Sequence, residues 1–585
     1  MKKILTFFVI LFTSLTLFSQ TFTTQWKVSL GGSDIDNANS ILQTTDGGYI
    51  AAGFSDSNNG DVSGNHGNPD YWIVKLNNQG VIQWQKSLGG TSVEQAHSII
   101  QTTDGGYVVA GYSYSNNGDV SGNHGGYDSW VVKLNNLGVI QWQKSLGGTG
   151  SDLANSIVQT ADGGYIVAGF SDSNNGDVSG NHGSSSDCWI VKLNDLGVIQ
   201  WQKSIGGSNY DDAYSIVQTT DGGYIVAGVS SSNDGDVSGN HGTFDYWVVK
   251  LNSLGVIQWQ KSLGGSSDDY AYSIVQTTDG GYVLAGVSIS NNGDVSGNQG
   301  AFDYWVVKLN SFGVIQWQKS LGGTGSDFAY SIIQTTDGGY VVAGYSNSNN
   351  GNVSGNNGRN DYWIVKLNNL GVIQWQHCLG GSNDDIASSI IQTSDGSYVV
   401  AGMVISNDGD VSGNHGSSDF WITKFSVLNF AVSPNYPCQD KYVHLTSEGC
   451  TGTTRWYNYF TIYDTPMLIH SGATYDYLVP NTIPLNTAIF FKCECLYANN
   501  AIISMGSPTF VRVLGASSYD FVHPNDDFTI TPPYPLNVSN SITATNQISG
   551  GNTQVIYQAE KGITLNPGFK VEQGAVFTAN IGGCQ

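Results

Sequence analysis

The chain has 585 residues and a formal net charge of −24, from 22 Lys and Arg against 46 Asp and Glu. This balance argues against a nucleic-acid-binding protein, because phosphate contacts need clustered Lys and Arg. Charged residues make up only 12% of the chain, and aromatic residues make up another 12%. That combination is typical of an exported all-β protein.

The first 19 residues are predicted to be a secretory signal peptide. Met1-Lys2-Lys3 precedes the apolar run Ile4–Phe18, and the small residue Ser19 fits a cleavage site, which would leave Gln20 first. No cysteine closely follows the apolar run, so a lipid anchor is not expected. No other stretch is long and apolar enough to span a bilayer. We therefore expect a secreted or cell-surface protein without a transmembrane segment once the signal is removed.

A unit of 58 residues, once 59, recurs seven times. Two tryptophan columns mark it. The first follows a Val-Ile-Gln motif in most copies: Trp26, Trp84, Trp142, Trp201, Trp259, Trp317 and Trp375. The second lies in an Asp-Tyr-Trp-Ile-Val-Lys-Leu motif: Trp72, Trp130, Trp189, Trp247, Trp305, Trp363 and Trp421. A fixed period near this length indicates a propeller, a solenoid or an array.

Each unit has the pattern of a four-stranded propeller blade. Gly-rich turns and one long polar stretch, residues 55–70, separate short apolar runs that lack helical periodicity. In the first unit the predicted strands are Ser40–Thr44, Tyr49–Gly53, Tyr71–Leu76 and Val81–Ser87. The third strand is apolar on both faces, as expected when each blade lies between two others. An open solenoid would instead need atypical capping repeats, which the sequence lacks.

The ends of the repeat array predict a closed ring. Gln25–Ser29 copies the fourth strand of a unit, whereas Asp419–Lys424, in the last unit, copies a third strand with no fourth strand after it. We therefore expect the N-terminal strand to complete the last blade, which removes exposed sheet edges. The predicted fold is an all-β, seven-bladed β-propeller over residues 20–426.

Residues 427–514 follow a different pattern, which resembles an immunoglobulin-like β-sandwich in its order of Cys, Trp and Cys. Cys493 and Cys495 lie two residues apart, so on a strand they share one face. Each is predicted to form a disulfide with Cys438 or Cys450, and both connectivities remain open. Oxidised pairs agree with export. Three further cysteines are expected to stay unpaired: Cys188, Cys378 and Cys584.

The last segment, residues 515–585, is predicted to be a linker and a small stacked-β module. Its phrases Tyr557–Phe569 and Gly574–Ala579 resemble the C-terminal three-coathanger stack of exported Bacteroidota proteins. The "DGGY … YWIVKL … GVIQWQ" repeats resemble β-propeller repeat proteins of the same bacteria. The resemblance implies export, often by the type IX system. The usual sorting phrase of that system is not seen, so the route stays open, and export or surface-anchoring machinery is the expected partner.

One acidic column precedes the first strand of every unit: Asp36, Glu94, Asp152, Asp211, Asp269, Asp327 and Asp385. First strands line the axis of a propeller, so these carboxylates are candidates for a ring at one mouth of the channel, where a ligand or a divalent cation would bind. The alternative, which we favour, is that each acid caps backbone N–H groups where its loop meets the strand.

The long polar loop is rich in oxygen donors of the kind that calcium prefers. Its candidate ligands in the first two units are Asn58, Asp61, Ser63, Asn116, Asp119 and Ser121. The spacing does not match an EF-hand, so a self-packed loop is favoured over calcium. The loop histidine becomes Gln299 and Asn357 in two units. Because zinc would not tolerate these changes, hydrogen bonding is the better interpretation.

No nucleotide-binding, serine-hydrolase or zinc-protease motif occurs in the sequence. Seven equal units also lack the asymmetric residue set that catalysis needs, so no catalytic residue is assigned. Repetition favours multivalent binding of a glycan or protein ligand, as in adhesion. The tryptophans would then be either inter-blade core, which we favour, or sugar-stacking rings. A propeller enzyme acting on extracellular polysaccharide and a purely structural surface component are the alternatives.

Overall fold

The computed structural model describes residues 18–433 without interruption and, beyond them, a series of strands from Tyr442 to Ile581 separated by undescribed segments. Side chains are described over residues 22–427. Every regular element in this part of the chain is a β-strand. The larger of two compact units comprises Thr24–Phe425, and the second holds the remaining residues at both ends. Residues 1–17, which contain most of the predicted signal peptide, lie outside the described residues.

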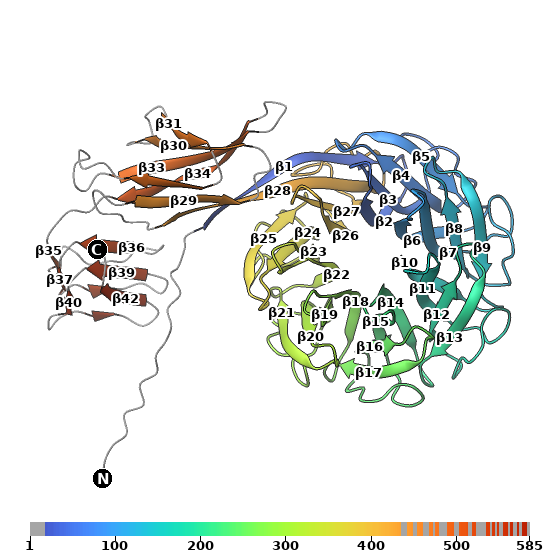
Figure 1. The fold of residues 1–585 in the computed structure, drawn as a ribbon. Helices are drawn as coiled ribbons and strands as arrows, with labels where there is room; N and C mark the ends of the chain where they lie inside the picture. Colours follow the sequence, from blue (N-terminus) through green and yellow to red (C-terminus); the bar gives the residue numbers. More distant parts are fainter. Residues whose placement is uncertain are drawn as a thin grey trace, which may run out of the picture. The chain divides into compact units, whose positions relative to one another are not determined.

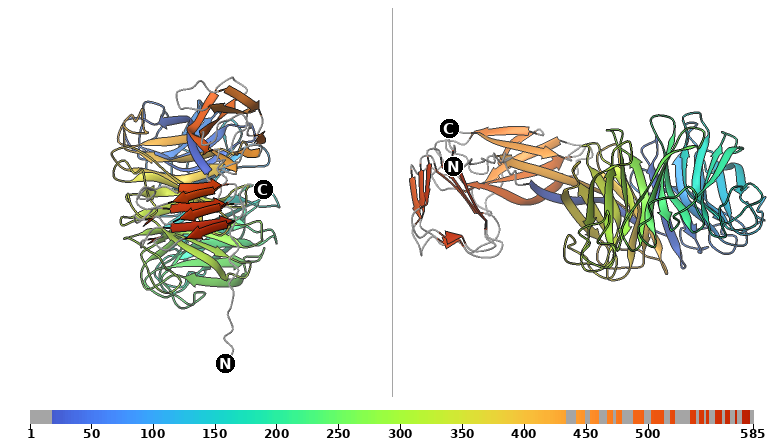
Figure 2. Two further views of the ribbon diagram at one scale, coloured as in Figure 1. Left: turned by 90° about the vertical axis from the view of Figure 1, so that its left-hand side faces the viewer. Right: turned by 90° about the horizontal axis from the view of Figure 1, so that it is seen from below.

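The larger unit is a seven-bladed propeller (Figure 1). Its first blade is an antiparallel sheet in the order β2 (Asp36–Gln43), β3 (Tyr49–Ser55), β4 (Asp70–Leu76) and β5 (Ile82–Leu88). β2 lies next to the axis and β5 lies at the rim. Figure 2 shows the ring from the side, with the strands running through its thickness.

The other blades repeat this order from the axis outward. Blades two to four are β6 (Glu94–Gln101), β7 (Tyr107–Ser113), β8 (Asp128–Leu134), β9 (Ile140–Leu146); β10 (Asp152–Gln159), β11 (Tyr165–Ser171), β12 (Asp187–Leu193), β13 (Ile199–Ile205); and β14 (Asp211–Gln218), β15 (Tyr224–Ser230), β16 (Asp245–Leu251), β17 (Ile257–Leu263). Blades five and six are β18 (Asp269–Gln276), β19 (Tyr282–Ser288), β20 (Asp303–Leu309), β21 (Ile315–Leu321); and β22 (Asp327–Gln334), β23 (Tyr340–Ser346), β24 (Asp361–Leu367), β25 (Ile373–Leu379).

The N-terminal strand closes the ring, as predicted. The seventh blade consists of β26 (Asp385–Gln392), β27 (Tyr398–Val404), the first part of β28 (Asp419–Ser433) and β1 (Phe18–Leu30), which pairs with β28. The same bond joins each blade to the next, for example from the Thr45 N–H to Gln101 Oε1 at 2.9 Å. In the seventh blade the Ser394 N–H donates to Gln43 Oε1 of the first blade at 2.8 Å. The array is therefore a ring, not a solenoid.

Each blade is covered on both faces, which explains the continuous apolar third strand. Trp72 and Val74 of β4 pack in one hydrophobic cluster with seventh-blade residues such as Phe420. Tyr71 and Ile73, on the opposite face, pack in a second cluster with second-blade residues. The buried Tyr71 hydroxyl donates to the Trp130 carbonyl at 2.9 Å, so the aromatic core also satisfies its polar atom.

The first strand is longer than the sequence predicted. β2 begins at Asp36, whereas the apolar pattern placed its start at Ser40. The register of β2 against β3 shifts between Ala38 and Ser40, which makes Asn39 the extra residue of a β-bulge. The bulge interrupts the alternation of side chains, so the sequence pattern did not predict residues 36–39 to be part of the strand.

Beyond the propeller, the described elements are short sheets. β29 (Tyr442–Glu448) pairs with the end of β28 and with β32 (Thr474–Leu478), and an antiparallel sheet has the order β31 (Met467–Ser471), β30 (Thr453–Tyr459), β33 (Ala488–Leu496) and β34 (Ile502–Arg512). Three parallel sheets follow: β35 (Ser518–Phe521), β37 (Ser541–Ala544) and β40 (Gly562–Leu565); β36 (Tyr534–Val538), β39 (Gln554–Ala559) and β42 (Val576–Ile581); and β38 (Gln547–Ile548) with β41 (Lys570–Val571). The proposed immunoglobulin-like and coathanger-like identities of these segments remain predictions.

Candidate ligand-binding sites between the blades

A cavity of about 440 Å³ lies between the first two blades, beside their β2–β3 and β6–β7 hairpin turns. The half-buried Trp84 and the buried Tyr107 line it, with ring centroids 6.0 Å apart. Asp46 and Asp104 of the two hairpins also line it, together with the amide side chains of Gln83 and Gln101 and the exposed Leu137. We call this set the hairpin pocket. It combines an aromatic surface with several hydrogen-bonding groups.

The hairpin carboxylates are held in their ionised form. Lys75 Nζ lies 3.0 Å from Asp46 Oδ2 and also donates to Gln83 Oε1 at 3.1 Å. Burial acts to raise the pKa of Asp46, but hydrogen bonds from Thr44 and Gly48 and the charge of Lys75 lower it to about 2. The pocket therefore presents fixed acceptors at neutral pH.

The aromatic contact of the hairpin pocket recurs around the ring. The same tilted contact between an outer-strand tryptophan and the tyrosine that follows the next hairpin occurs at every blade junction, with centroid distances of 5.5–6.0 Å. The second tryptophan column is different, because Trp72 is fully buried and its Nε1 donates to Gln85 Oε1 at 2.9 Å. The core interpretation is thus confirmed for the second column. Six first-column tryptophans pack, half-buried, against the same inter-blade clusters, and one of them, Trp84, also lines the hairpin pocket.

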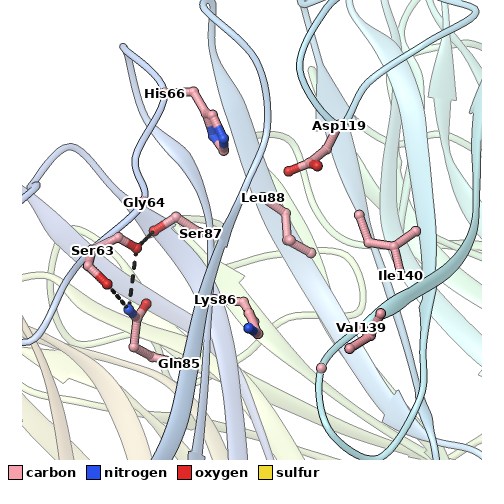
Figure 3. Close-up of a pocket in the computed structure, with 11 residues that line it drawn as sticks. Ser63, Gly64, His66, Gln85, Lys86, Ser87, Leu88, Asp119, Val139 and Ile140 are labelled. Carbon is pink, nitrogen blue, oxygen red and sulfur yellow. Dashed lines mark hydrogen bonds between the residues drawn. The ribbon is translucent and has the colours of Figure 1, made fainter.

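A second cavity, of about 520 Å³, lies between the same blades beside the long polar loop (Figure 3). Ser63 and His66 come from the loop of the first blade, Gln85 and Ser87 from β5, and Asp119 from the loop of the second blade. Figure 3 shows Ser63 bonded to both Gln85 and Ser87. We call this set the loop pocket.

The loop histidine joins its loop to the third strand. His66 Nδ1 lies 2.6 Å from Oδ2 of the completely buried Asp70, which also accepts from the His66 N–H at 3.0 Å. The other four loop histidines make the same contact with their own aspartate. This agrees with hydrogen bonding as the role of the histidine column.

The two exceptional loop residues of one junction meet in space. Gln299 replaces the histidine of the fifth blade, and Asn352 replaces the loop aspartate of the sixth. Gln299 Nε2 donates to Asn352 Oδ1 at 3.3 Å. At the junction of blades three and four, His182 Nε2 faces Asp236 Oδ2 at 3.8 Å. Burial acts to lower the pKa of His182, but its bond to Asp187 and the charges of Asp187, Asp236 and Asp211 raise it.

The acidic column before the first strand is buried inside the ring. All seven carboxyl groups are completely buried: Asp36, Glu94, Asp152, Asp211, Asp269, Asp327 and Asp385. Asp36 Oδ2 accepts from the Gly32 N–H at 2.7 Å and from Ser57 Oγ at 3.0 Å. Burial raises the pKa of Asp36 to about 6, and the nearby charge of Asp419 adds to the shift. In this arrangement the column contacts the protein's own backbone and hydroxyl groups.

The six calcium candidates also bond to the protein itself. Asn58 Oδ1 accepts from the Gly64 N–H at 3.2 Å, and Asp61 Oδ2 from the Gly31 N–H at 3.3 Å. Ser63 bonds to Gln85, and the second-blade set makes equivalent bonds: Asn116, Asp119 and Ser121. Among the residues described, no group of three or more His, Cys, Asp or Glu side chains is arranged to hold a metal ion.

Two cysteines of the propeller are free and buried, as expected. Burial raises the pKa of the Cys378 thiol to about 12 and that of Cys188 well above its ordinary value, so both remain protonated. The candidate disulfide residues fall outside the residues whose side chains are described: Cys438, Cys450, Cys493 and Cys495.

Tyr107, Gln83 and Gln101 were not singled out from the sequence. The first tryptophan column and the hairpin aspartates are visible as repeats, but their convergence depends on contacts between blades. Trp84 and Asp104 belong to neighbouring units, and nothing within one unit shows that they share a cavity. The sequence signal that could have indicated the site is the presence of the first tryptophan column and the hairpin aspartate column in every unit.

No protein-family model and no curated protein matches this chain. Solved structures with similar folds include BBS1N in complex with ARL6DN, at 10% identity over 68% of this chain and 96% of the other, with a TM-score of 0.37. Puromycin hydrolase is 10% identical over 71% of this chain and 59% of its own, with a TM-score of 0.38. A GH43_12 protein from a capybara gut metagenome is 11% identical over 83% and 91%, with a TM-score of 0.26. At this similarity, function has to be argued from the geometry.

A membrane-spanning helix is not found in the described part of the chain: no helix there is both long and apolar enough to cross a bilayer.

Proposed function

We propose that this protein is an exported, extracellular or cell-surface binding protein that recognises glycans through its repeated hairpin pockets. The observation that carries the proposal is the half-buried Trp84, which faces a cavity lined by carboxylate and amide groups. Sugar rings have apolar faces that stack on aromatic rings and hydroxyl groups that bond to such acceptors and donors. A concave site with few, well-placed polar groups is the usual form of a small-ligand site.

Repetition is the second support for this function. Similar pockets around one rigid ring would each bind weakly, and a polymer that reaches several of them gains affinity from effective concentration. Sugar polymers and dense surface glycans offer repeated ligands of this kind. The predicted signal peptide agrees with a location where such ligands occur.

The test is glycan binding by the mature chain and by variants that remove tryptophan from increasing numbers of pockets. We expect Trp84→Ala alone to weaken binding of a polymeric ligand by only about 2-fold, and a combined change at Trp84, Trp142 and Trp201 to weaken it by more than about 10-fold.

A matched control is the double variant Asp234→Asn, Asp408→Asn, which places at two exposed loop positions the residue that the other five blades carry. It should bind glycan as the unaltered chain does. Absence of binding across a broad glycan array would contradict the proposal. Release of shorter sugars from a bound polysaccharide would instead favour the enzyme alternative.

A further inference from the structure

Two weakly constrained positions change little among the seven repeats. The turn before the outer strand carries an exposed valine at one position in six blades, with exposed fractions of 52–60%: Val81, Val139, Val198, Val256, Val314 and Val372. The exposed loop asparagine represented by Asn58 is present in all seven. These two columns have diverged little, whereas the loop column represented by Asp56 varies among the blades: Asp56, Tyr114, Asp172, Ser231, Ile289, Asn347 and Ile405.

One position within the first strand differs in every blade. The residues are Asn37, Gln95, Leu153, Asp212, Tyr270, Phe328 and Ile386. Its neighbours on the same strand hardly change: the preceding position is always acidic, and the following position, represented by Ala38, is always alanine. All seven variable side chains are half-buried, so free drift of an exposed residue does not explain the difference.

The position two residues further along also varies, and it divides the ring into two sides. Blades one and three carry Asn, blade two carries His97 and blade seven carries Ser388, whereas blades four to six carry Tyr214, Tyr272 and Tyr330. Both variable positions lie on β2 and its equivalents, the strands that surround the axis (Figure 1). Polar residues fill these places in half of the ring, so the fold itself does not require the tyrosines.

The three tyrosines form a continuous aromatic arc. Neighbouring ring centroids lie 5.1 Å apart, both from Tyr214 to Tyr272 and from Tyr272 to Tyr330. Tyr270 and Phe328, from the first variable position, extend the arc with further ring contacts at 6.3 Å and 6.4 Å. The arc makes blades four to six differ from the other four blades at the same positions.

Carboxylates adjoin this arc. Asp212 accepts a hydrogen bond from Ser186 Oγ at 2.7 Å. Its charge adds to the burial that raises the pKa of Tyr214. Burial raises the pKa of Asp212 to about 6, so the group is mostly ionised at neutral pH. The charge of Asp268 likewise adds to the burial that raises the pKa of Tyr270. Aromatic faces bearing negative quadrupoles beside anionic groups favour a cation.

We propose that the aromatic arc of Tyr214, Tyr272 and Tyr330 binds one organic cation per chain, an alkylammonium group, with Asp212 as its counter-charge. The group would belong either to a small quaternary amine or to a lysine side chain. This site is independent of the hairpin pocket, which lies between the first two blades.

The test uses the full mature chain and pairs of probes that differ only in charge. Choline is compared with its neutral isostere 3,3-dimethyl-1-butanol, and N-acetyl-lysine amide with N-acetyl-norleucine amide, by calorimetry at neutral pH. We expect one site per chain and about 3- to 30-fold tighter binding of the charged member of a pair. The tighter of the two cations identifies the source of the group.

The variants place residues that other blades already carry at the same positions, so the ring should fold. Tyr272→Asn reproduces Asn39 and Asn155, and Asp212→Asn reproduces Asn37. Each should weaken cation binding by about 3-fold or more. Asp234→Asn removes an equal charge from an exposed loop position of the same blade and should leave binding unchanged.

Equal binding of charged and neutral probes overturns the proposal, as does a stoichiometry near seven. So does unaltered binding in Tyr272→Asn, or the absence of cation binding up to about 10 mM. The proposed function fails separately, since it depends on glycan binding and on the tryptophan column. Loss of either kind of binding leaves the other testable.

Discussion

At the residue scale, a glycine in the turn before the outer strand of the first six blades makes room for a tryptophan of the preceding blade. Gly138 has φ of +75°, and a Cβ there would lie 2.9 Å from the Trp84 ring. Gly105 has φ of +82°, but a Cβ there would meet nothing within 4 Å. An alanine at either position would have a strained backbone, but only an alanine at Gly138 would also clash with a neighbouring side chain.

We therefore predict different costs for the two alanine variants. Gly105→Ala should lower the free energy of unfolding by about 1 kcal/mol, from the left-handed backbone alone. Gly138→Ala should lower it by about 3 kcal/mol, because overpacking against the indole adds to that strain. Urea unfolding of both variants measures the difference. Equal losses would show that the glycine column is required only for its backbone conformation.

Single residues also show where sequence reasoning ends. Gln299 and Asn352 each stand out as an exception in their own column, yet they lie 53 positions apart and their hydrogen bond appears only in the folded ring. The repeat makes each column visible, but it does not state which residue of one blade touches which residue of the next. For the same reason the tryptophan and hairpin columns were predicted, whereas the pocket that they form together was not.

At the element scale, the role of β1 in closing the ring can be tested directly. β1 supplies the buried Leu30 and the half-buried Trp26 and Val28 to the cluster between the seventh and first blades. Thr423 Oγ1 of β28 lies 3.5 Å from the Trp26 carbonyl. Without β1, the edge of β28 and this apolar cluster would both be exposed.

We predict that a chain starting at Gly31 loses on the order of 5 kcal/mol of stability relative to a chain starting at Gln20. It should also self-associate, because an unpaired strand edge invites pairing with another chain. Thermal unfolding and sedimentation of the two chains provide the measurement. A monomeric truncated chain with an unaltered melting temperature would show that closure does not depend on β1.

The strands themselves were largely predictable. The third and fourth strands of the first unit begin within one residue of their predicted starts, because apolar runs and turn glycines bound them directly. The first strand was misplaced since its bulge at Asn39 hides the alternation. Closure was predictable from the permuted ends, which depend on element order and not on side-chain contacts.

At the scale of the whole molecule, two sets of acids give opposite dependences of stability on pH. Burial, partly offset by hydrogen bonds, raises the pKa of one set to about 6: Asp36, Asp70, Asp211, Asp212, Asp269 and Asp303. Their stabilisation is complete below the ordinary value of 3.8 and is lost as pH rises through 6. Six hairpin acids have pKa values lowered to about 2: Asp46, Asp104, Asp162, Asp221, Asp279 and Asp395. Their stabilisation is present above 3.8 and is lost as pH falls through 2.

The ring should therefore be most stable in mild acid, near about pH 4, and should lose stability as pH rises through about 6, with little further change toward about pH 8. Urea unfolding across this range measures the slope.

Burial and the nearby charge of Asp385 raise the pKa of Asp361 to about 7, opposed by a bond from the Asn357 N–H. Asp361→Asn should thus raise stability at about pH 8 by on the order of 1 kcal/mol and flatten the profile. The exposed-loop variant Asp234→Asn should leave the slope unchanged. A profile that rises from mild acid to about pH 8 would mean that the buried acids are stabilised as carboxylates, for example by cations held between the blades.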